Sequence, residues 1–226
     1  MALIERSAAP ALAPVTPSAT FGAFRRPVQA TGWKSWLFTV DHKKLGLLYC
    51  ATSFVFFLVG GIEALLIRAQ LAGPNGTILD ADKYNQMFTM HATTMVFLFV
   101  MPMTTGLANY FVPLQIGARD VSFPRINAFG YWCFLAGALF INVSWLTGGA
   151  ADGGWFMYAP NSSVPFSPGH GIDFWGLGIQ ITGIASLTGA VNLITTIINM
   201  RAPGMTLMKM PIFTWMTLVV QFLLLF

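Results

Sequence analysis

Five apolar runs limit how this chain of 226 residues can fold. Four of them are longer than about 20 residues, the length that an α-helix needs to cross the hydrocarbon core of a bilayer. Hydrophobic residues make up 55% of the chain and charged residues 9%, a balance far from that of a soluble domain. The sequence therefore predicts an all-α protein, a polytopic transmembrane helix bundle, with spans at residues 45–69, 85–112, 126–146, 174–200 and 212–226.

The segment before the first span has a different composition. Residues 1–32 are rich in Ala, Pro, Ser and Thr and lack the continuous apolar run of a signal peptide. We expect a flexible cytoplasmic tail here, and a single unit over residues 33–226. Trp33 and Trp36, which follow the tail, suit the membrane interface.

Lys and Arg are distributed unevenly between the two sides of the predicted bundle. Lys83 and Arg68 are the cations of one side, whereas the other side carries Arg6, Arg25, Arg26, Lys34, Lys43, Lys44, Arg119, Arg125, Arg201 and Lys209. Because Lys and Arg are enriched in cytoplasmic segments, the amino terminus is predicted to be cytoplasmic. These cations flank apolar spans and do not form a basic patch interleaved with aromatic residues, so no nucleic-acid partner is expected.

His91 is an ionisable side chain within the second span, in the run YNQMFTMHATTMVFLFVMPM. Such a residue is costly in a bilayer unless it has a partner, so it is either a neutral histidine bonded to a neighbouring helix or a cofactor ligand. A rise of 1.5 Å per residue places His91 about 10 Å below the outer surface, at a depth similar to that of Arg68. Arg68 is interpreted as a snorkelling side chain or as the partner of an acidic cofactor substituent. The role of Glu63, also in the first span, stays open.

Other polar residues have simpler interpretations. Asp120 reads, on its own, as a loop carboxylate that pairs with Arg119 or Arg125 or caps the third span. His42, among charged residues, is expected to be solvated or interfacial rather than a metal ligand. His170 is expected to form hydrogen bonds within an outer loop. The two cysteines, Cys50 and Cys133, are expected to serve in packing.

Several segments together resemble the first part of subunit I of the haem-copper terminal oxidases, and its cytochrome c oxidase branch in particular. They are VDHKKLGLLY, LLIRAQL, YNQMFTMHATTMVFLFVMPM, ANYFVPLQIGARDVSFPRIN and GAVNLITTIINMRAPGM. The similarity covers residues 33–226 in order. It implies the first five helices of a twelve-helix subunit, the fifth of them incomplete.

The resemblance also implies roles for particular residues. His91 matches an axial ligand of the low-spin haem iron, haem A in the aa3-type enzymes, and Arg68 matches the arginine that contacts the formyl group of that haem. Tyr84 and Trp155 match aromatic positions near the outer surface beside the haem. A high-spin haem and copper are expected from helices beyond residue 226.

A second set of matches concerns proton transfer. Asp120 matches the aspartate at the mouth of the D-pathway, through which protons enter from the cytoplasmic side. Asn109 and Asn127 match polar residues just inside this mouth, and Ser186 and Asn192 match water-binding positions further along.

The function implied by the resemblance is that of a proton-translocating cytochrome c oxidase. The expected partners are the remaining helices of subunit I, oxidase subunits II and III, cytochrome c and the lipid bilayer of a bacterial plasma membrane. A ubiquinol oxidase is disfavoured because Val59 stands where bo-type enzymes carry an arginine, four residues before Glu63. A further alternative is a transporter or assembly subunit in which His91, Arg68 and Asp120 only stabilise helix packing. Residues 1–226 alone are not expected to reduce oxygen.

Overall fold

The computed structural model describes residues 32–225, and every regular element within this range is helical. The elements are α1 (Lys34–Leu37), α2 (His42–Gln70), α3 (Ala81–Thr93), η2 (Thr94–Val100), α4 (Met101–Ile116), α5 (Pro124–Val143), η3 (Ser144–Leu146), α6 (Gly171–Asn199), η4 (Leu207–Lys209) and α7 (Ile212–Leu225). The predicted all-α class is confirmed. The predicted tail, residues 1–32, lies outside the described residues except for Gly32.

Within residues 32–225, four continuous helices are long and apolar enough to cross a membrane: His42–Gln70, Ala81–Ile116, Pro124–Leu146 and Gly171–Asn199. They match the first four predicted spans with ends that differ by a few residues. The shorter apolar helix α7 begins at Ile212, the residue predicted for the fifth span, and has 14 residues. The chain is therefore a multi-pass membrane helix bundle.

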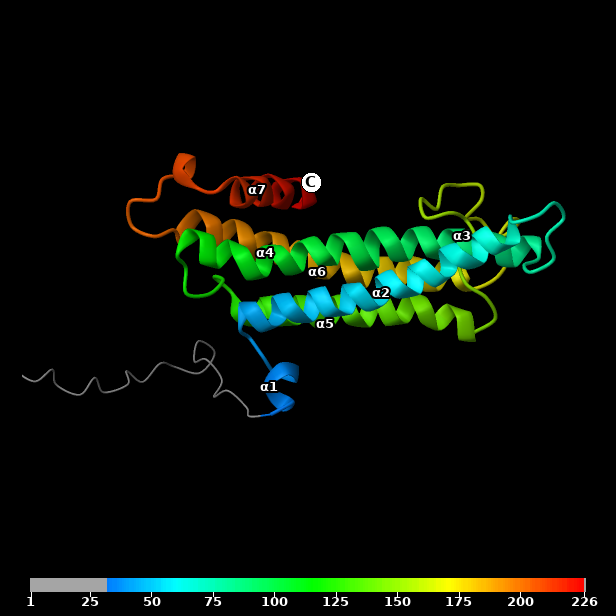
Figure 1. Ribbon diagram of the computed structural model, residues 1–226, viewed down its shortest axis with the longest axis horizontal. Coiled ribbons are helices and arrows are strands. Elements are labelled where there is room, and N and C mark those ends of the chain that lie inside the picture. The colour runs from blue at the N-terminus through cyan, green and yellow to red at the C-terminus, as the bar shows by residue number, and fades with distance from the viewer. Residues whose placement is uncertain (1–31, 226) are drawn as a thin grey trace, which may run out of the picture.

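The long helices lie side by side and alternate in direction, and α7 lies against α4 and α6 over part of their length (Figure 1). The start of α2 and the loops 117–123 and 200–211 meet at one end, which we call the basic end. The loops 71–80 and 147–170 meet at the opposite end (Figure 1). Among described cations, Arg68 and Lys83 belong to the opposite end, and the basic end carries Lys34, Lys43, Lys44, Arg119, Arg125, Arg201 and Lys209.

Local sequence signals explain where the helices begin and end. Asp41 and Asp80 cap α2 and α3, because each carboxylate accepts a hydrogen bond from a first-turn backbone N–H, at 2.8 Å and 2.7 Å. Pro124 occupies the first turn of α5, where a missing N–H costs little. Gly117 ends α4 in the left-handed conformation, at φ 73°, which glycine adopts without strain.

The second span is not a uniform α-helix. A π-helical segment, η2, separates α3 from α4, and the backbone N–H of Met101 bonds to the carbonyl of Val96, five residues earlier. Pro102 follows directly; it has no N–H to donate, and its ring would press on the carbonyl of Leu98 in a regular α-helix. The wider π-helical turn accommodates that conflict. Such turns recur at functional sites, and this one begins three residues after His91.

Close contacts between helices fix the core. A Cβ atom on Gly106 of α4 would lie 2.8 Å from Cys50 Sγ and 2.9 Å from the carbonyl oxygen of Gly46, so α2 and α4 approach backbone to backbone. In the same stretch of α2, the ring of Tyr49 stacks on Phe134 of α5 with centroids 5.4 Å apart. Cys50 and Cys133 are free and half-buried, in agreement with the predicted packing role.

Candidate functional site

His91 is half-buried on α3 and faces α2. Its Nδ1 lies 2.9 Å from the carbonyl oxygen of Gly60. A carbonyl oxygen can only accept a hydrogen bond, so Nδ1 carries the hydrogen and Nε2 of the neutral ring keeps its lone pair. The contact therefore sets both the tautomer and the direction of the ring, which is the arrangement that ligating histidines require.

Gly60 allows the two helices to come this close. A Cβ atom at this position would lie 2.8 Å from Met95 Sδ and 3.3 Å from Thr94 Cγ2, both in η2. A larger residue would have to displace the Met95 side chain and would crowd Thr94, next to the contact with His91. The glycine, the π-helical turn and the histidine thus form one packed unit.

Glu63 is buried one turn beyond Gly60 on the same face of α2. The hydroxyl of Thr94 lies near its carboxyl group, close enough to interact but outside hydrogen-bond geometry, and Oε2 has no hydrogen-bond partner among the described residues. The structure thus places Glu63 beside the His91 unit without assigning it a role.

The other predicted haem-side residues lie at different levels along the bundle. Arg68 is exposed in the last turn of α2, eight residues or about 12 Å beyond Gly60, so it is not level with His91 as the depth argument predicted. The depth argument failed because it counted each residue from the end of its own span and ignored how the two helices are shifted along each other. Tyr84 is half-buried in the first turn of α3. Trp155 lies in the loop 147–170, with its ring centroid 6.4 Å from that of Phe97.

A row of polar side chains on α3 holds this loop in place. Thr89 Oγ1 accepts a 2.9 Å bond from the backbone N–H of Gly154, and Gln86 Oε1 accepts a weaker one from Ala150 at 3.4 Å. One turn beyond Thr89, Thr93 Oγ1 accepts a 2.9 Å bond from the indole N–H of Trp175 on α6. The spacing of these residues in the sequence indicates that they share one face of α3. The sequence does not indicate which residues they contact.

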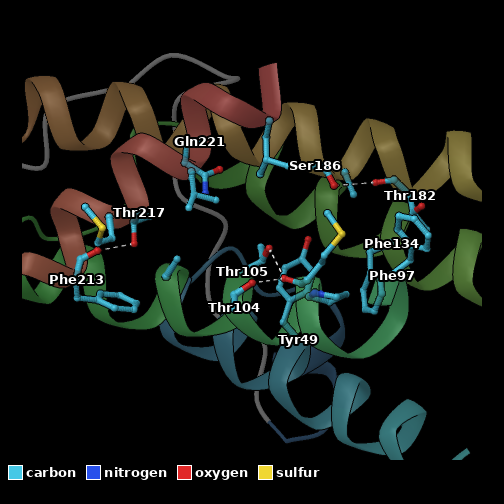
Figure 2. Close-up of a pocket in the computed structure, with 17 residues that line it drawn as sticks. Tyr49, Phe97, Thr104, Thr105, Phe134, Thr182, Ser186, Phe213, Thr217 and Gln221 are labelled. Atoms are coloured by element: carbon cyan, nitrogen blue, oxygen red, sulfur yellow. Dashed lines mark hydrogen bonds between the residues drawn. The ribbon is translucent and has the colours of Figure 1, made fainter. Parts of the chain in front are cut away.

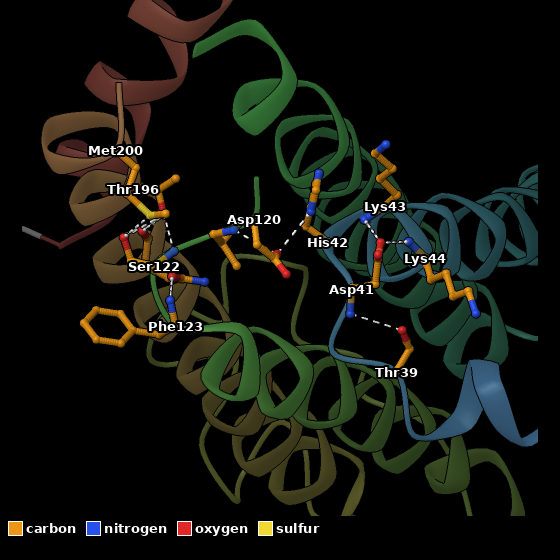
Figure 3. Close-up of polar contacts among 12 residues, drawn as sticks. Thr39, Asp41, His42, Lys43, Lys44, Asp120, Ser122, Phe123, Thr196 and Met200 are labelled. Carbon is orange, nitrogen blue, oxygen red and sulfur yellow. Dashed lines mark hydrogen bonds and ion pairs between the residues drawn. The ribbon is translucent and has the colours of Figure 1, made fainter. Parts of the chain in front are cut away.

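Asp120 lies at the basic end, in the loop after α4, and is buried (Figure 3). Its Oδ1 accepts a bond from His42 Nδ1 at 3.1 Å and from the backbone N–H of Val121 at 2.8 Å. The cap of α5 is Phe123, so the predicted capping role of Asp120 is wrong. Arg119 is exposed.

His42 is 2% exposed, so the expectation of a solvated or interfacial side chain is also wrong. The charged neighbours Asp41, Lys43 and Lys44 concealed its position on the buried face of α2, which it shares with Leu45. The spacing of three residues between His42 and Leu45 was the feature of the sequence that could have indicated burial of His42.

The loop that carries Asp120 is fastened to α6. Asn192 Oδ1 accepts a 2.8 Å bond from the backbone N–H of Phe123, and Thr196 Oγ1 accepts a 2.9 Å bond from that of Ser122 (Figure 3). Asn192 was predicted to bind water, and the structure adds this anchoring role.

Three buried asparagines lie on the helices at this end, and each has an unsatisfied polar atom. Asn109 Oδ1, Asn127 Nδ2 and Asn192 Nδ2 have no hydrogen-bond partner among the described residues, and neither does His42 Nε2. Buried polar atoms are normally satisfied, and ordered water is the usual partner where the protein supplies none. These atoms lie on α2, α4, α5 and α6, the helices that meet at the end of the bundle where Asp120 lies.

Ser186 belongs to a separate cavity of about 260 Å³ among α2, η2, α4, α5, α6 and α7 (Figure 2). Its hydroxyl bonds weakly to the carbonyl of Thr182 at 3.4 Å. Thr104, Thr105, Thr217 and Gln221 also line the cavity, and so it has a polar wall within an apolar bundle. Ser186 is six residues, about 9 Å along α6, from Asn192.

His170 is exposed, and its Nδ1 lies 3.1 Å from Asp173 Oδ2, so the predicted loop hydrogen bonding is confirmed. Within residues 32–225, no three side chains of His, Cys, Asp or Glu lie close enough together to bind a metal ion.

Comparisons with known proteins place the chain in a family. The family model described as Cytochrome C and Quinol oxidase polypeptide I matches residues 44–226. Cytochrome c oxidase subunit 1 of Bacillus subtilis (strain 168) is 56% identical over 191 residues, which are 84% of this chain and 30% of the relative. The corresponding subunit of Bacillus sp. (strain PS3) is 53% identical over 204 residues, or 90% of this chain and 33% of the relative.

Quinol oxidase subunit 1 of Bacillus subtilis (strain 168) is 46% identical over 194 residues, which are 86% of this chain and 30% of the relative. The chain thus spans about a third of the length of these relatives. The chain belongs to the cytochrome c and quinol oxidase polypeptide I family.

Proposed function

We propose that this chain is the amino-terminal part of the catalytic subunit of a proton-translocating cytochrome c oxidase. In this proposal His91 is an axial ligand of low-spin haem A, with Arg68, Tyr84 and Trp155 around the same haem. The high-spin haem and copper that complete oxygen reduction to water are assigned to helices beyond residue 226. A bound haem supplies one-electron transfer, while the residues of this chain orient and insulate it.

The contact between His91 and Gly60 is the observation that carries the proposal. A histidine that only packed against α2 would also be satisfied by this bond, so the ligand role is supported by the family match and the bond contributes the orientation of the ring. Here Nδ1 is occupied by the Gly60 carbonyl at 2.9 Å, and Nε2 keeps the lone pair that iron needs. The exposed guanidinium of Arg68 lies on the outer side of this site, where a polar substituent of the macrocycle would find a cation.

Cytochrome c is favoured over quinol as the electron donor. The cytochrome c oxidase relatives from Bacillus are 53–56% identical and the quinol oxidase relative is 46% identical. Val59 also stands at the position of the bo-type arginine. Oxidase subunits II and III and the remaining helices of subunit I are the proposed partners.

We assign proton uptake to the basic end. Asp120 would take up protons there, and the unsatisfied atoms of Asn109, Asn127 and Asn192 would hold the water that carries them onward. Ser186 and its cavity lie further along the bundle. The concentration of Lys and Arg at this end supports a cytoplasmic location, in a bacterial plasma membrane.

Replacing His91 with Ala in the complete oxidase tests the haem assignment. We expect the low-spin haem bands of the reduced-minus-oxidised spectrum to disappear while the subunit still inserts into the membrane. His170→Ala is the matched control and should keep the bands, because His170 is exposed in a loop. A normal low-spin spectrum in the His91 variant would refute the assignment and would favour a packing role.

Asp120→Asn tests the proton assignment separately. The amide preserves the shape of the side chain but cannot exchange the proton, so oxygen consumption and proton uptake should fall together. If the variant keeps wild-type oxygen turnover and takes up the same number of protons per oxygen, Asp120 has only a structural role. That result would leave the haem assignment unaffected.

A further inference from the structure

The segment before the first span presents a basic and aromatic surface away from the bundle. Helix α1 lies off the side of the basic end, beside the start of α2 (Figure 1), and it has no buried residues. Trp33 is 68% exposed and Phe38 70%, and Trp36 and Leu37 are each 41% exposed. An apolar group of this size on a short, separate element indicates contact with something other than water.

Lysines are held against the aromatic rings of this surface. Lys34 Nζ lies 5.9 Å from the ring centroid of Trp33, and Lys44 Nζ lies 5.6 Å from that of Trp36. Lys44 belongs to the first turn of α2 and also donates a 3.2 Å hydrogen bond to Ser35 Oγ, which ties α1 to α2. The cations are therefore fixed beside the apolar rings rather than spread through solvent.

The nearby acid does not neutralise these cations. The carboxylate of Asp41 accepts bonds from the backbone N–H groups of Lys43 and Lys44, at 2.8 Å and 3.3 Å (Figure 3). Three lysines, Lys34, Lys43 and Lys44, against this one carboxylate leave a net charge of +2 on residues 33–44. The surface thus has charge complementarity with an anion that also offers apolar contact.

The position of this surface at the end of a membrane span indicates which kind of molecule it contacts. Residue 42 is the first residue of a helix long and apolar enough to cross a membrane, and α1 lies beside that end of the helix, where we place the boundary between bilayer and water. Tryptophan rings favour that level, and lysines beside them attract anionic headgroups. We propose that α1 and the first turn of α2 form a binding surface for anionic phospholipids in the adjoining leaflet, with Lys34 and Lys44 on the phosphate and Trp33 and Trp36 among the upper acyl chains.

Quenching of tryptophan fluorescence by brominated lipid tests this proposal. The purified full chain is reconstituted in vesicles that contain either dibrominated phosphatidylglycerol or dibrominated phosphatidylcholine. The signal of Trp33 and Trp36 is obtained by subtracting the signal of a Trp33→Phe, Trp36→Phe variant. We expect stronger quenching by phosphatidylglycerol, and a preference that falls about fivefold for each lysine changed in Lys34→Gln and Lys44→Gln.

Lys83→Gln is the matched control, since Lys83 is an exposed lysine at the opposite end, and it should leave the preference unchanged. Equal quenching by the two lipids, or a preference that survives loss of both lysines, would overturn the proposal. An absence of quenching by either lipid would show that protein covers the surface, and would also overturn it. Loss of the preference on adding inorganic phosphate, relative to chloride at equal ionic strength, would identify a site for the free ion instead.

Discussion

Burial should make the hydrogen bond between His42 and Asp120 far more stabilising than a similar bond at the surface. The chain offers its own comparison, because His170 and Asp173 have the same atoms at the same 3.1 Å separation. The side chains of the first pair are 2% and 7% exposed, and those of the second are 83% and 73% exposed. Distance and chemistry are matched, so that the surroundings are the main difference.

The expected magnitude follows from the one hydrogen bond that Asp120 loses with His42. In His42→Leu the volume is largely preserved, but the carboxylate loses one donor and retains the backbone N–H of Val121. A hydrogen bond to a charged group contributes about 1.5–3 kcal/mol. We therefore expect the free energy of unfolding to fall by about 2 kcal/mol. His42→Gln, whose amide can still donate, should lose less than half of that.

Unfolding of the purified chain in mixed micelles of increasing dodecyl sulfate content, followed by circular dichroism, measures these losses. His170→Leu should show no resolvable change, since exposed pairs are screened by water and cost side-chain entropy to form. Equal losses in His42→Leu and His170→Leu, or a neutral His42→Leu, would refute the argument from burial. A loss in His42→Gln as large as in His42→Leu would show that ring packing, not the hydrogen bond, is responsible.

Three further predictions use the same unfolding assay or proteolysis. Gly106→Leu should destabilise the chain by about 1–3 kcal/mol or more through overpacking against α2, whereas Gly183→Leu, where a Cβ meets nothing within 4 Å, should be tolerated. Thr89→Val should free the N–H of Gly154 and make the loop 147–170 cleave faster in limited proteolysis, and an unchanged rate would argue against the anchor. Gly117→Ala should cost about 1–2 kcal/mol because an L-residue is strained at a φ of 73° and the added Cβ would lie 3.0 Å from that of Ala202, and a stabilised variant would contradict both reasons.

Features that depend on one segment were predicted well from the sequence. Apolar length located the spans, and the uneven distribution of cations anticipated the basic end. Features that depend on how two helices meet were not predicted well. The depth argument placed Arg68 level with His91, whereas the residue of α2 that contacts His91 is Gly60. The π-helical turn was missed for a related reason, since a proline near a helical run predicts strain without saying how the backbone relieves it. The pairing of His42 with Asp120 joins residues 78 positions apart, which no local pattern specifies.

Helix α2 links the two candidate sites through a single face. His42 bonds to Asp120 at the basic end, and the carbonyl of Gly60 bonds to His91 18 residues later. Eighteen residues are five turns at 3.6 residues per turn, so both contacts lie on one side of the helix, about 27 Å apart along its axis. Tyr49 lies between them on that buried side. A helix turns about its own axis as one body. The packing that fixes the rotation of α2 at one site therefore also fixes it at the other. The orientation of the His91 ring and the position of the Asp120 carboxylate therefore depend on the same helix register.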